Sequence, residues 1–142
     1  MTTLQQLIDH KGRAIYAVGP DSPVIDAVRI MAENHVGALL VLQGDKLEGI
    51  ISERDYARKV VLKGRSSSDT PVRDIMSAPV VTVAPQASVN DAMRIMTEQR
   101  IRHLPVVSGV KVLGVVSIGD LVKSVIDEQR HQIEDLETYI RG

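Results

Sequence analysis

The stretch GIISERD, from Gly49 to Asp55, comes back 65 positions later as GVVSIGD, from Gly114 to Asp120. Residues 16–61 can be laid over residues 81–126 without a gap, and they share 17 identities in 46 aligned positions. Ordinary composition would give roughly three. The chain is therefore a tandem duplication, and the repeat decides its architecture.

Each copy of the repeat predicts the same order of elements: strand, helix, strand, strand, helix. A β-rich run, IYAV (15–18) or VVTV (80–83), is followed by apolar residues at helical spacing behind a serine, Ser22 or Ser88, that can cap the helix. Two apolar runs joined by a glycine turn then indicate a hairpin, and a second helix follows. We expect an α/β (α+β) fold.

The positions of the repeats divide the chain into five segments. We expect an N-terminal helical lead-in (1–14), a first motif (15–63), a linker (64–79), a second motif (80–127) and a C-terminal helical extension (128–142). In the lead-in, Leu4, Leu7 and Ile8 share one helical face. In the linker, a short helix is predicted after Thr70, with Pro71 in its first turn.

Apolar residues of the C-terminal helix recur at alternating spacings of four and three. The positions are Val122, Ile126, Gln129, Ile133, Leu136 and Ile140, of which only Gln129 is polar. This rhythm is typical of a helix-packing seam. Two interpretations stay open, namely a helix packed on its own domain and a contact with a second subunit.

The composition excludes several classes of protein. Among 142 residues, 17 basic and 18 acidic side chains leave a net charge of −1, and Trp and Phe are absent, so nucleic acid is not expected as a partner. The absence of cysteine excludes disulfides and fits a reducing compartment. No apolar run approaches the length of a membrane span, and the N-terminus does not resemble a signal peptide. We expect a cytoplasmic protein without membrane contact.

Each Ser-x-x-Asp sequence allows two interpretations. Ser52 with Asp55, and Ser117 with Asp120, fit a helix-capping box. A helix start also offers unpaired N–H groups that suit phosphate, and a carboxylate can accept two hydrogen bonds from a ribose diol. The glycine three positions before each serine would then let the backbone approach a ligand. Two such helix starts facing a shared cleft would hold a nucleotide.

The repeated Gly-h-h-Ser-x-x-Asp pattern (h apolar), the lead-in DIMSAPVVTVAPQASVNDAM and the strand RHLPVV resemble the CBS domain, in a tandem pair often called a Bateman module. The resemblance covers about residues 15–126. It implies a regulatory module whose two repeats pack through their sheets with pseudo-twofold symmetry. It also implies adenosine-containing ligands, such as AMP, ADP, ATP, NAD or S-adenosylmethionine, in the clefts between the repeats.

The resemblance further implies a set of nucleotide-binding residues. The set is Ser52, Arg54, Asp55, Thr82, Arg102, His103, Leu104, Pro105, Ser117 and Asp120. The two aspartates would hold ribose hydroxyls, supported by the two serines. The threonine would serve the adenine and ribose end, and the start of the RHLPVV strand would face the phosphates.

The two predicted sites are unequal. At the positions aligned with Thr82, Arg102 and His103 of the second copy, the first copy has Ala17, Gly37 and Ala38. Conversely, Arg54 of the first copy aligns with Gly119 of the second. Arginine is a fork-shaped partner for phosphate. We expect the Asp120 site to take a monophosphate nucleotide such as AMP. The Asp55 site would take a different or larger adenosine ligand, or none.

Neither catalytic groups nor metal ligands form a recognisable pattern. No P-loop or dinucleotide-binding fingerprint occurs, and nothing assembles a nucleophile, a base and an orienting group. His131 and Glu134 are interpreted as a solvated face, and Asp26 and Asp91 as acidic residues of first helical turns. We therefore expect a stand-alone regulatory protein without enzyme activity or metal.

This regulatory protein is expected to form a homodimer and to act on an effector protein in trans. One alternative is a structural interaction module without a ligand, in which the Ser-x-x-Asp pairs only cap helices. Another is catalysis on a bound nucleotide.

Overall fold

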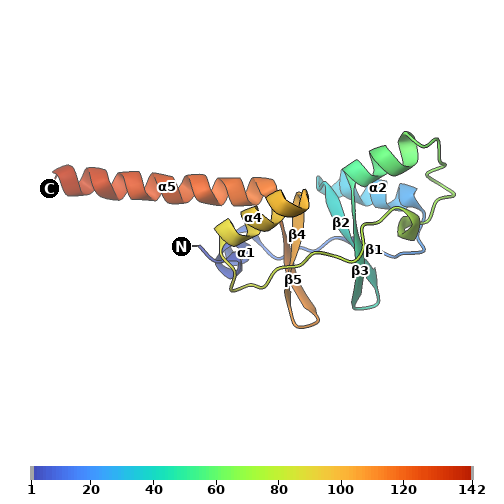
Figure 1. Cartoon of the computed structure of the whole chain (residues 1–142), viewed down its shortest axis with the longest axis horizontal. Coiled ribbons are helices and arrows are strands. Elements are labelled where there is room, and N and C mark those ends of the chain that lie inside the picture. The colour runs from blue at the N-terminus through green and yellow to red at the C-terminus, as the bar shows by residue number, and fades with distance from the viewer. Residues whose placement is uncertain (1, 142) are drawn as a thin grey trace. The chain divides into compact units, whose positions relative to one another are not determined.

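The computed structural model describes residues 2–141, which form two compact units (Figure 1). Unit 1 combines Met1–Arg13 with Thr82–Gly142, and unit 2 consists of Ala14–Val81. Each unit contains one copy of the repeat. The N-terminal segment therefore belongs to the unit of the second copy, although the first copy follows it directly in the sequence.

Unit 2 contains a three-stranded sheet in the order β1-β2-β3. Its elements are β1 (Ala17–Val18), α2 (Val24–Asn34), β2 (Ala38–Gln43), β3 (Lys46–Ser52), α3 (Glu53–Tyr56), the π-helix η1 (Ala57–Val61) and the 3-10 helix η2 (Val72–Asp74). Strand β1 runs parallel to β2, and β2 and β3 form an antiparallel hairpin. Gly44 at the hairpin turn has a φ of 61°, which glycine adopts without steric cost. The predicted order of elements is confirmed in this copy, although the first strand occupies only the last two residues of its predicted range.

Unit 1 repeats this plan with one strand fewer. Its elements are α1 (Leu4–Lys11), α4 (Val89–Gln99), β4 (His103–Ser108), β5 (Lys111–Ser117) and α5 (Ile118–Arg141). The strand predicted over 80–83 is wrong, because only Val83 pairs, in an isolated parallel bridge with Val106. Pro79 and Pro85 on either side lack an amide hydrogen, so neither can donate to a longer ladder.

The serine predicted to cap the first helix of each copy does so only in the second copy. Ser88 precedes α4, and its Oγ accepts a hydrogen bond from the Asp91 amide at 3.0 Å, while Asp91 Oδ2 accepts one from the Ser88 amide at 3.2 Å. The prediction for Ser22 is wrong, because α2 begins after Pro23 and has no side-chain cap. Pro23 is the residue that aligns with Ser88, so the serine of the first copy lies one position too early.

The N-terminal segment and the linker dock in equivalent ways. In unit 1, Thr3 forms a bridge with Ser88, and in unit 2, Pro71 forms a bridge with Pro23. Because Ser88 and Pro23 are equivalent positions of the repeat, the two docked segments are also equivalent. The short helix η2 begins just after Pro71, one position later than predicted. The N-terminal segment, which precedes the first copy, thus packs on the second copy. The linker, which precedes the second copy, packs on the first.

Two buried glycines leave room for these docked segments. A Cβ atom on Gly49 would lie 2.6 Å from Met76 Sδ and 3.0 Å from the Ser77 carbonyl oxygen. A Cβ atom on Gly114 would lie 3.3 Å from Ile8. The interpretation that these glycines admit a ligand is therefore wrong, because the protein's own chain fills the space beside each of them.

The same repeat positions form the core of both units. The buried equivalents are Val24 and Val89, Ala27 and Ala92, Met31 and Met96, Leu39 and Leu104, and Val41 and Val106. In unit 1, α1 adds Leu4, Leu7 and Ile8 to this core, and Leu4 and Ile8 are fully buried. The apolar face predicted for the N-terminal helix is thereby confirmed.

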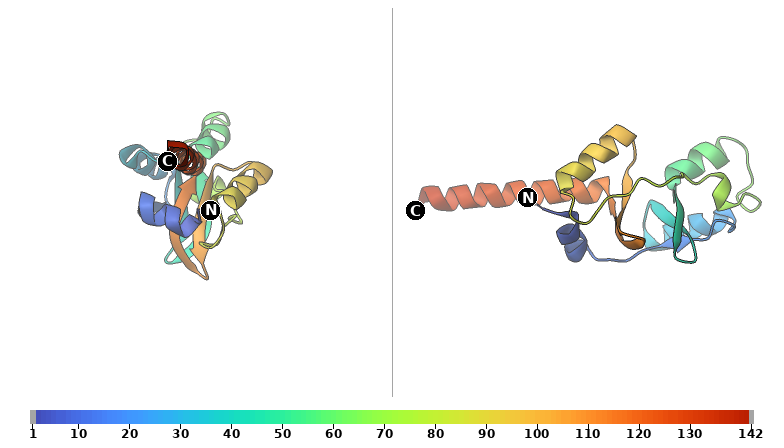
Figure 2. Two further views of the ribbon diagram at one scale, coloured as in Figure 1. Left: turned by 90° about the vertical axis from the view of Figure 1, so that its left-hand side faces the viewer. Right: turned by 60° about the horizontal axis from the view of Figure 1, so that its bottom comes forward.

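Helix α5 is continuous over 24 residues. Leu121 is fully buried, but every residue from Gln129 to Arg141 is exposed. Figures 1 and 2 show this half of the helix extending beyond the other elements of unit 1. The interpretation of a helix packed on its own domain therefore holds for the first turns of α5 but not for its second half.

Candidate functional site

Both Ser-x-x-Asp sequences form capping boxes in the structure. At the start of α3, Ser52 Oγ accepts a hydrogen bond from the Asp55 amide at 3.2 Å, and Asp55 Oδ2 accepts one from the Ser52 amide at 3.0 Å. At the start of α5, the Asp120 amide donates to Ser117 Oγ at 3.1 Å, and the Ser117 amide donates to Asp120 Oδ2 at 2.8 Å. The predicted helix caps are confirmed, and both carboxylates are held in fixed positions.

A lysine approaches each of the two carboxylates, but from a different part of the chain. Lys11 of α1 lies 2.5 Å from Asp120 Oδ2 and also donates to the Val115 carbonyl at 2.9 Å. Lys59 lies 3.2 Å from Asp55 Oδ1 and comes from the next turn of the same helical segment. Only the Asp120 carboxylate is thus coupled to the N-terminal helix.

The pKa of Asp120 lies below its ordinary value of 3.8. Burial is the largest single influence and acts in the opposite direction, but hydrogen bonds from Lys11 and from the Ser117 amide outweigh it. The side chains of Lys11 and Asp120 remain 36% and 27% exposed, so the ion pair itself contributes at most about 1 kcal/mol. At neutral pH, Asp120 is a carboxylate that can accept hydrogen bonds from hydroxyl groups.

We expect Asp120→Asn to make the melting temperature less sensitive to acid. Because the folded pKa lies below the unfolded value, ionised Asp120 stabilises the fold above about pH 4, and this stabilisation is lost as the pH falls through the folded pKa. Melting curves between about pH 5 and pH 2 check this, and the melting temperature of the variant should fall less than that of the wild type. Asp9 and Asp91 also have lowered pKa values, but they act equally in both proteins. Identical acid dependence in the two proteins would contradict the prediction.

Seven of the predicted site residues lie in unit 1, around the start of α5. They are Thr82, Arg102, His103, Leu104, Pro105, Ser117 and Asp120. The Ile118 amide donates to the Arg102 carbonyl at 2.9 Å, and His103 pairs with Ser117 across the β4–β5 hairpin. Thr82 and Arg102 are exposed and His103 is half-buried, whereas Leu104 and Pro105 lie in the core. These backbone contacts place Arg102 and His103 beside the start of α5, where the Asp120 carboxylate is held, and Thr82 next to Val83, which pairs with β4.

The other three predicted site residues lie in unit 2, at the start of α3. Ser52 and Asp55 form the cap, and Arg54 between them is exposed. The Glu53 amide donates to the Gly37 carbonyl at 3.0 Å, as Ile118 does to Arg102 in unit 1. The backbone arrangement is the same in both units, but glycine replaces the arginine in unit 2.

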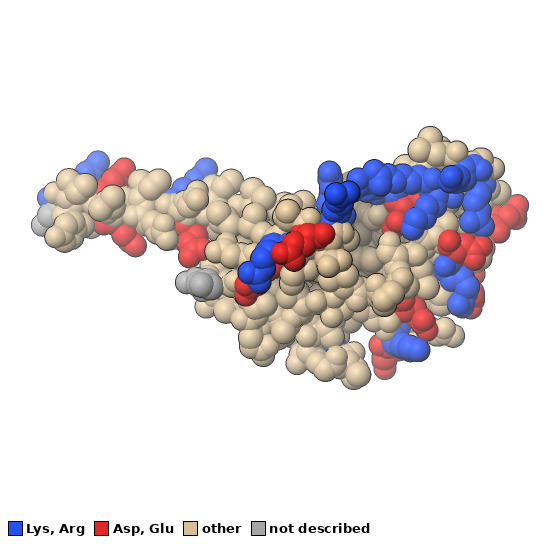
Figure 3. All heavy atoms as spheres, viewed as in Figure 1, with Lys and Arg blue, Asp and Glu red and all other residues tan. Residues whose placement is uncertain are grey.

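The surface of unit 2 is basic along α3, η1 and the segment that follows. The exposed basic residues there are Arg54, Arg58, Lys59, Lys63 and Arg65. Figure 3 shows lysine and arginine side chains gathered over this part of the molecule. The first copy lacks an arginine just before β2, but it carries basic side chains on α3 and η1.

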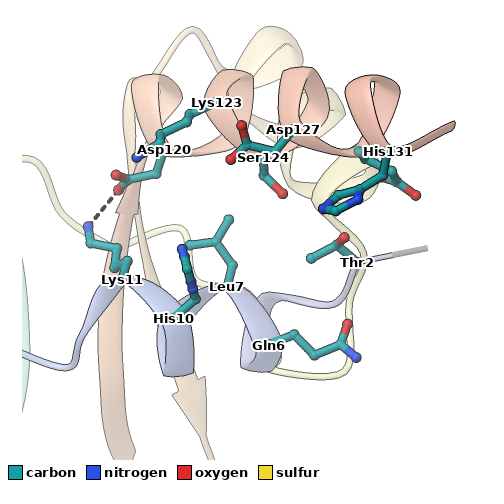
Figure 4. A pocket seen from close by; sticks show the side chains of 11 residues that line it. Thr2, Gln6, Leu7, His10, Lys11, Asp120, Lys123, Ser124, Asp127 and His131 are labelled. Atoms are coloured by element: carbon teal, nitrogen blue, oxygen red, sulfur yellow. Dashed lines mark hydrogen bonds and ion pairs between the residues drawn. The ribbon is translucent and has the colours of Figure 1, made fainter. Parts of the chain in front are cut away.

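A pocket of about 670 Å³ lies in unit 1 between α1 and α5 (Figure 4). Its lining residues are Thr2, Gln6, Leu7, His10, Lys11, Asp120, Lys123, Ser124, Asp127, Glu128 and His131. The volume is within the usual range for small-molecule sites. In Figure 4 the ion pair between Lys11 and Asp120 lies at one end of the pocket and His131 at the other. Asp120 therefore belongs both to the start of α5 and to the rim of this pocket.

Neither of the lysines that neighbour the two aspartates was predicted from the sequence. Lys59 could have been recognised, because it lies four positions after Asp55, where side chains meet on a helix. Lys11 carries no such local signal, because it lies 109 positions from Asp120. Recognising it would have required the equivalence between the N-terminal segment and the linker.

The fold and the two equivalent helix starts define a tandem pair of α/β modules. The model of the CBS domain matches residues 12–62 and 72–127. The chain belongs to the CBS-domain family.

Several known proteins are similar to this chain. It is 42% identical over 150 residues to the mitochondrial CBS domain-containing protein CBSX3 of Arabidopsis thaliana, a match that covers 99% of this chain and 73% of that protein. A solved structure from Burkholderia ambifaria MC40-6, described as a signal-transduction protein with CBS domains, is 53% identical with a TM-score of 0.86 and coverages of 90% and 96%. A CBS-domain containing protein from Agrobacterium tumefaciens is 35% identical with a TM-score of 0.82 and coverages of 87% and 98%. These similarities confirm the resemblance and the α/β fold class.

Two further properties concern residues 2–141. None of the helices in this range combines the length and the apolar character that crossing a membrane requires. Within the same range, no group of three or more His, Cys, Asp or Glu side chains is arranged to hold a metal ion.

Proposed function

We propose that this protein is a regulatory module that binds an adenosine-containing nucleotide and changes its contact with an effector protein in response. The observation that carries the proposal is the set of groups around the start of α5, where a fixed, partly exposed carboxylate lies at a helix start in the same unit as Arg102 and Thr82. A helix start favours phosphate, and a carboxylate accepts hydrogen bonds from a ribose diol. These are the two chemical features that a nucleotide presents.

Each residue has a proposed role in binding. Asp120 accepts hydrogen bonds from the ribose hydroxyls, and Ser117 keeps the helix start in place. Arg102 donates to the phosphate, with His103 beside it. Thr82 contacts the adenine and ribose end, while Leu104 and Pro105 support the strand from the core. AMP is the expected ligand, and ADP, ATP or NAD are the other members of the same class.

The Lys11 ammonium changes the electrostatics of the proposed site. It already occupies Oδ2 of Asp120, so an arriving ribose either shares this oxygen or displaces the lysine. A displaced Lys11 carries a positive charge next to the ligand, which favours a phosphorylated nucleoside over adenosine. Nucleotide binding would in this way change the ion pair that connects α1 to Asp120.

A second site is proposed in unit 2, built from Ser52, Arg54 and Asp55. It lacks the threonine, arginine and histidine of unit 1 but has the basic surface of α3 and η1. A ligand with more phosphate groups than AMP fits this surface better. The two units would then respond to different nucleotides or to different phosphorylation states.

The remaining features of the proposal concern the protein as a whole. We propose a homodimer in the cytoplasm that acts in trans on an effector protein, without enzyme activity. One alternative is favoured by a specific observation, since both Ser-x-x-Asp pairs make complete capping boxes. In this alternative the protein is a dimerisation module without a ligand, and the serines and aspartates only stabilise helix starts.

A ligand panel on the purified protein tests the proposal. Without Trp the chain absorbs weakly at 280 nm, so co-purified adenine would be visible as excess absorbance at 260 nm. Calorimetry with AMP, ADP, ATP, NAD and adenosine should give saturable binding, tightest for a phosphorylated nucleoside. A ligand at a hundred times its Kd should stabilise the fold by about 2.7 kcal/mol. Failure of every nucleotide to bind would leave the dimerisation module, and hydrolysis of bound ATP or NAD would indicate an enzyme instead.

A further inference from the structure

The second half of α5 presents an apolar stripe that unit 1 does not cover. Ile133, Leu136 and Ile140 are 57%, 60% and 73% exposed. An isolated helix of this length is only marginally stable in water, and large exposed apolar residues in one stripe mark a protein contact. The exposed stripe therefore indicates a surface that contacts another protein.

Towards the start of the same helix, the stripe continues over an open surface patch formed by Ile118, Gly119, Val122, Lys123, Ile126, Asp127 and Arg130. Val122 and Ile126, which are 41% and 43% exposed, continue into the stripe at the heptad spacing of a helix pair. One apolar seam thus runs from Val122 to Ile140 and includes polar Gln129.

The charges beside the seam show which partner it fits. On one flank Lys123, Arg130 and Glu137 follow each other at intervals of seven, whereas the other flank carries Val125, Gln132 and Tyr139, which are uncharged. In a parallel pair of identical helices, each flank faces the opposite flank of the partner, so the charges would face uncharged residues. In an antiparallel pair, like flanks face each other, and Arg130 of either copy lies beside Glu137 of the other.

We propose that the C-terminal part of this seam, from Gln129 to Ile140, binds the same part of a second copy in an antiparallel pair. Ile133 of one copy then packs on Leu136 of the other, and the polar Gln129 lies beside Ile140 near the edge of the contact. Such a contact is symmetric, so the pair closes as a dimer. Val122 and Ile126 lie outside the paired segment. This inference specifies the homodimer proposed above and does not depend on nucleotide binding.

The mass of the purified protein without nucleotide tests the proposal. Sedimentation at about 100 µM should give a dimer, twice the 15.5 kDa of one chain, in the range expected for a contact of micromolar affinity. Leu136→Lys should return the mass to that of a monomer. Thr138→Lys adds the same charge on the opposite face of the helix and should leave the dimer intact. A monomeric wild type, or a Leu136→Lys dimer, would overturn the proposal.

Reversal of the flanking charges tests the orientation. Arg130→Glu and Glu137→Arg should each weaken the dimer, because each places like charges side by side, and the double variant should restore it. Single variants that dimerise like the wild type would overturn the antiparallel arrangement. Because residues from Gln129 onward lie outside the core of unit 1, circular dichroism of these variants should show an otherwise folded protein. Nucleotide binding measured on Leu136→Lys separates a failure of this inference from a failure of the proposed function.

Discussion

Replacing Asp120 with alanine is expected to weaken AMP binding at least tenfold. In the proposed complex this carboxylate accepts two hydrogen bonds from the ribose diol, and hydrogen bonds to a charged group contribute about 1.5–3 kcal/mol each. No other carboxylate stands at the start of α5, because the preceding positions are Ile118 and Gly119. Calorimetric titration with AMP, at a temperature where the variant is folded, measures the change.

The same substitution also removes a helix cap, so its effect on folding needs a matched control. Asp91→Ala removes the equivalent capping carboxylate at the start of α4 and should lower stability by a similar amount, about 1 kcal/mol, without changing the affinity for AMP. Lys11→Met removes the ion pair but keeps the carboxylate, and should reduce the preference for AMP over adenosine. An Asp120→Ala protein that binds AMP normally while melting lower would show that Asp120 is a helix cap only.

The elements of the fold were predictable because their signals are local. The hairpins follow from apolar runs around Gly44 and Gly109, and both glycines adopt the left-handed conformation that such turns require. The helices follow from buried residues such as Ala27 and Met31, which recur at the helical period. The duplication strengthened each of these predictions, because a pattern that occurs twice is seldom accidental.

Some of the errors have local causes, and others arose where distant segments decide the outcome. The strand over 80–83 has suitable residues, but flanking prolines leave Val83 alone to pair. Gly49 and Gly114 were interpreted as ligand contacts, whereas they make room for segments that dock from elsewhere in the chain. Docking of this kind depends on shape and burial in three dimensions, which spacing along the sequence does not record.

The same distinction between local and long-range signals applies to the candidate site. The capping hydrogen bonds of Ser117 and Asp120 span three residues and were predicted correctly. The neighbours of the carboxylate were not, because Lys11 and the pocket lined by His10 and His131 exist only after α1 has docked on unit 1. The chemistry of the site thus depends on the packing of the N-terminal helix.

Ile8→Ala is therefore expected to affect both the fold and the site. Ile8 is fully buried and lies against Gly114, which has no side chain that could fill the resulting cavity. Substitutions of this kind lower the free energy of unfolding by about 2–5 kcal/mol. Because Ile8 holds α1 on unit 1, its loss should also loosen the Lys11 ion pair and the pocket between α1 and α5.

Urea unfolding followed by circular dichroism measures the loss of stability. Leu62→Ala, at a side chain that is 77% exposed, is the control and should change the free energy of unfolding by no more than about 0.5 kcal/mol. If Ile8→Ala behaves like this control, α1 does not contribute to the core of unit 1. If the large loss of unfolding free energy is observed, the N-terminal helix stabilises the second copy of the repeat. A change at α1 would then affect Asp120 directly.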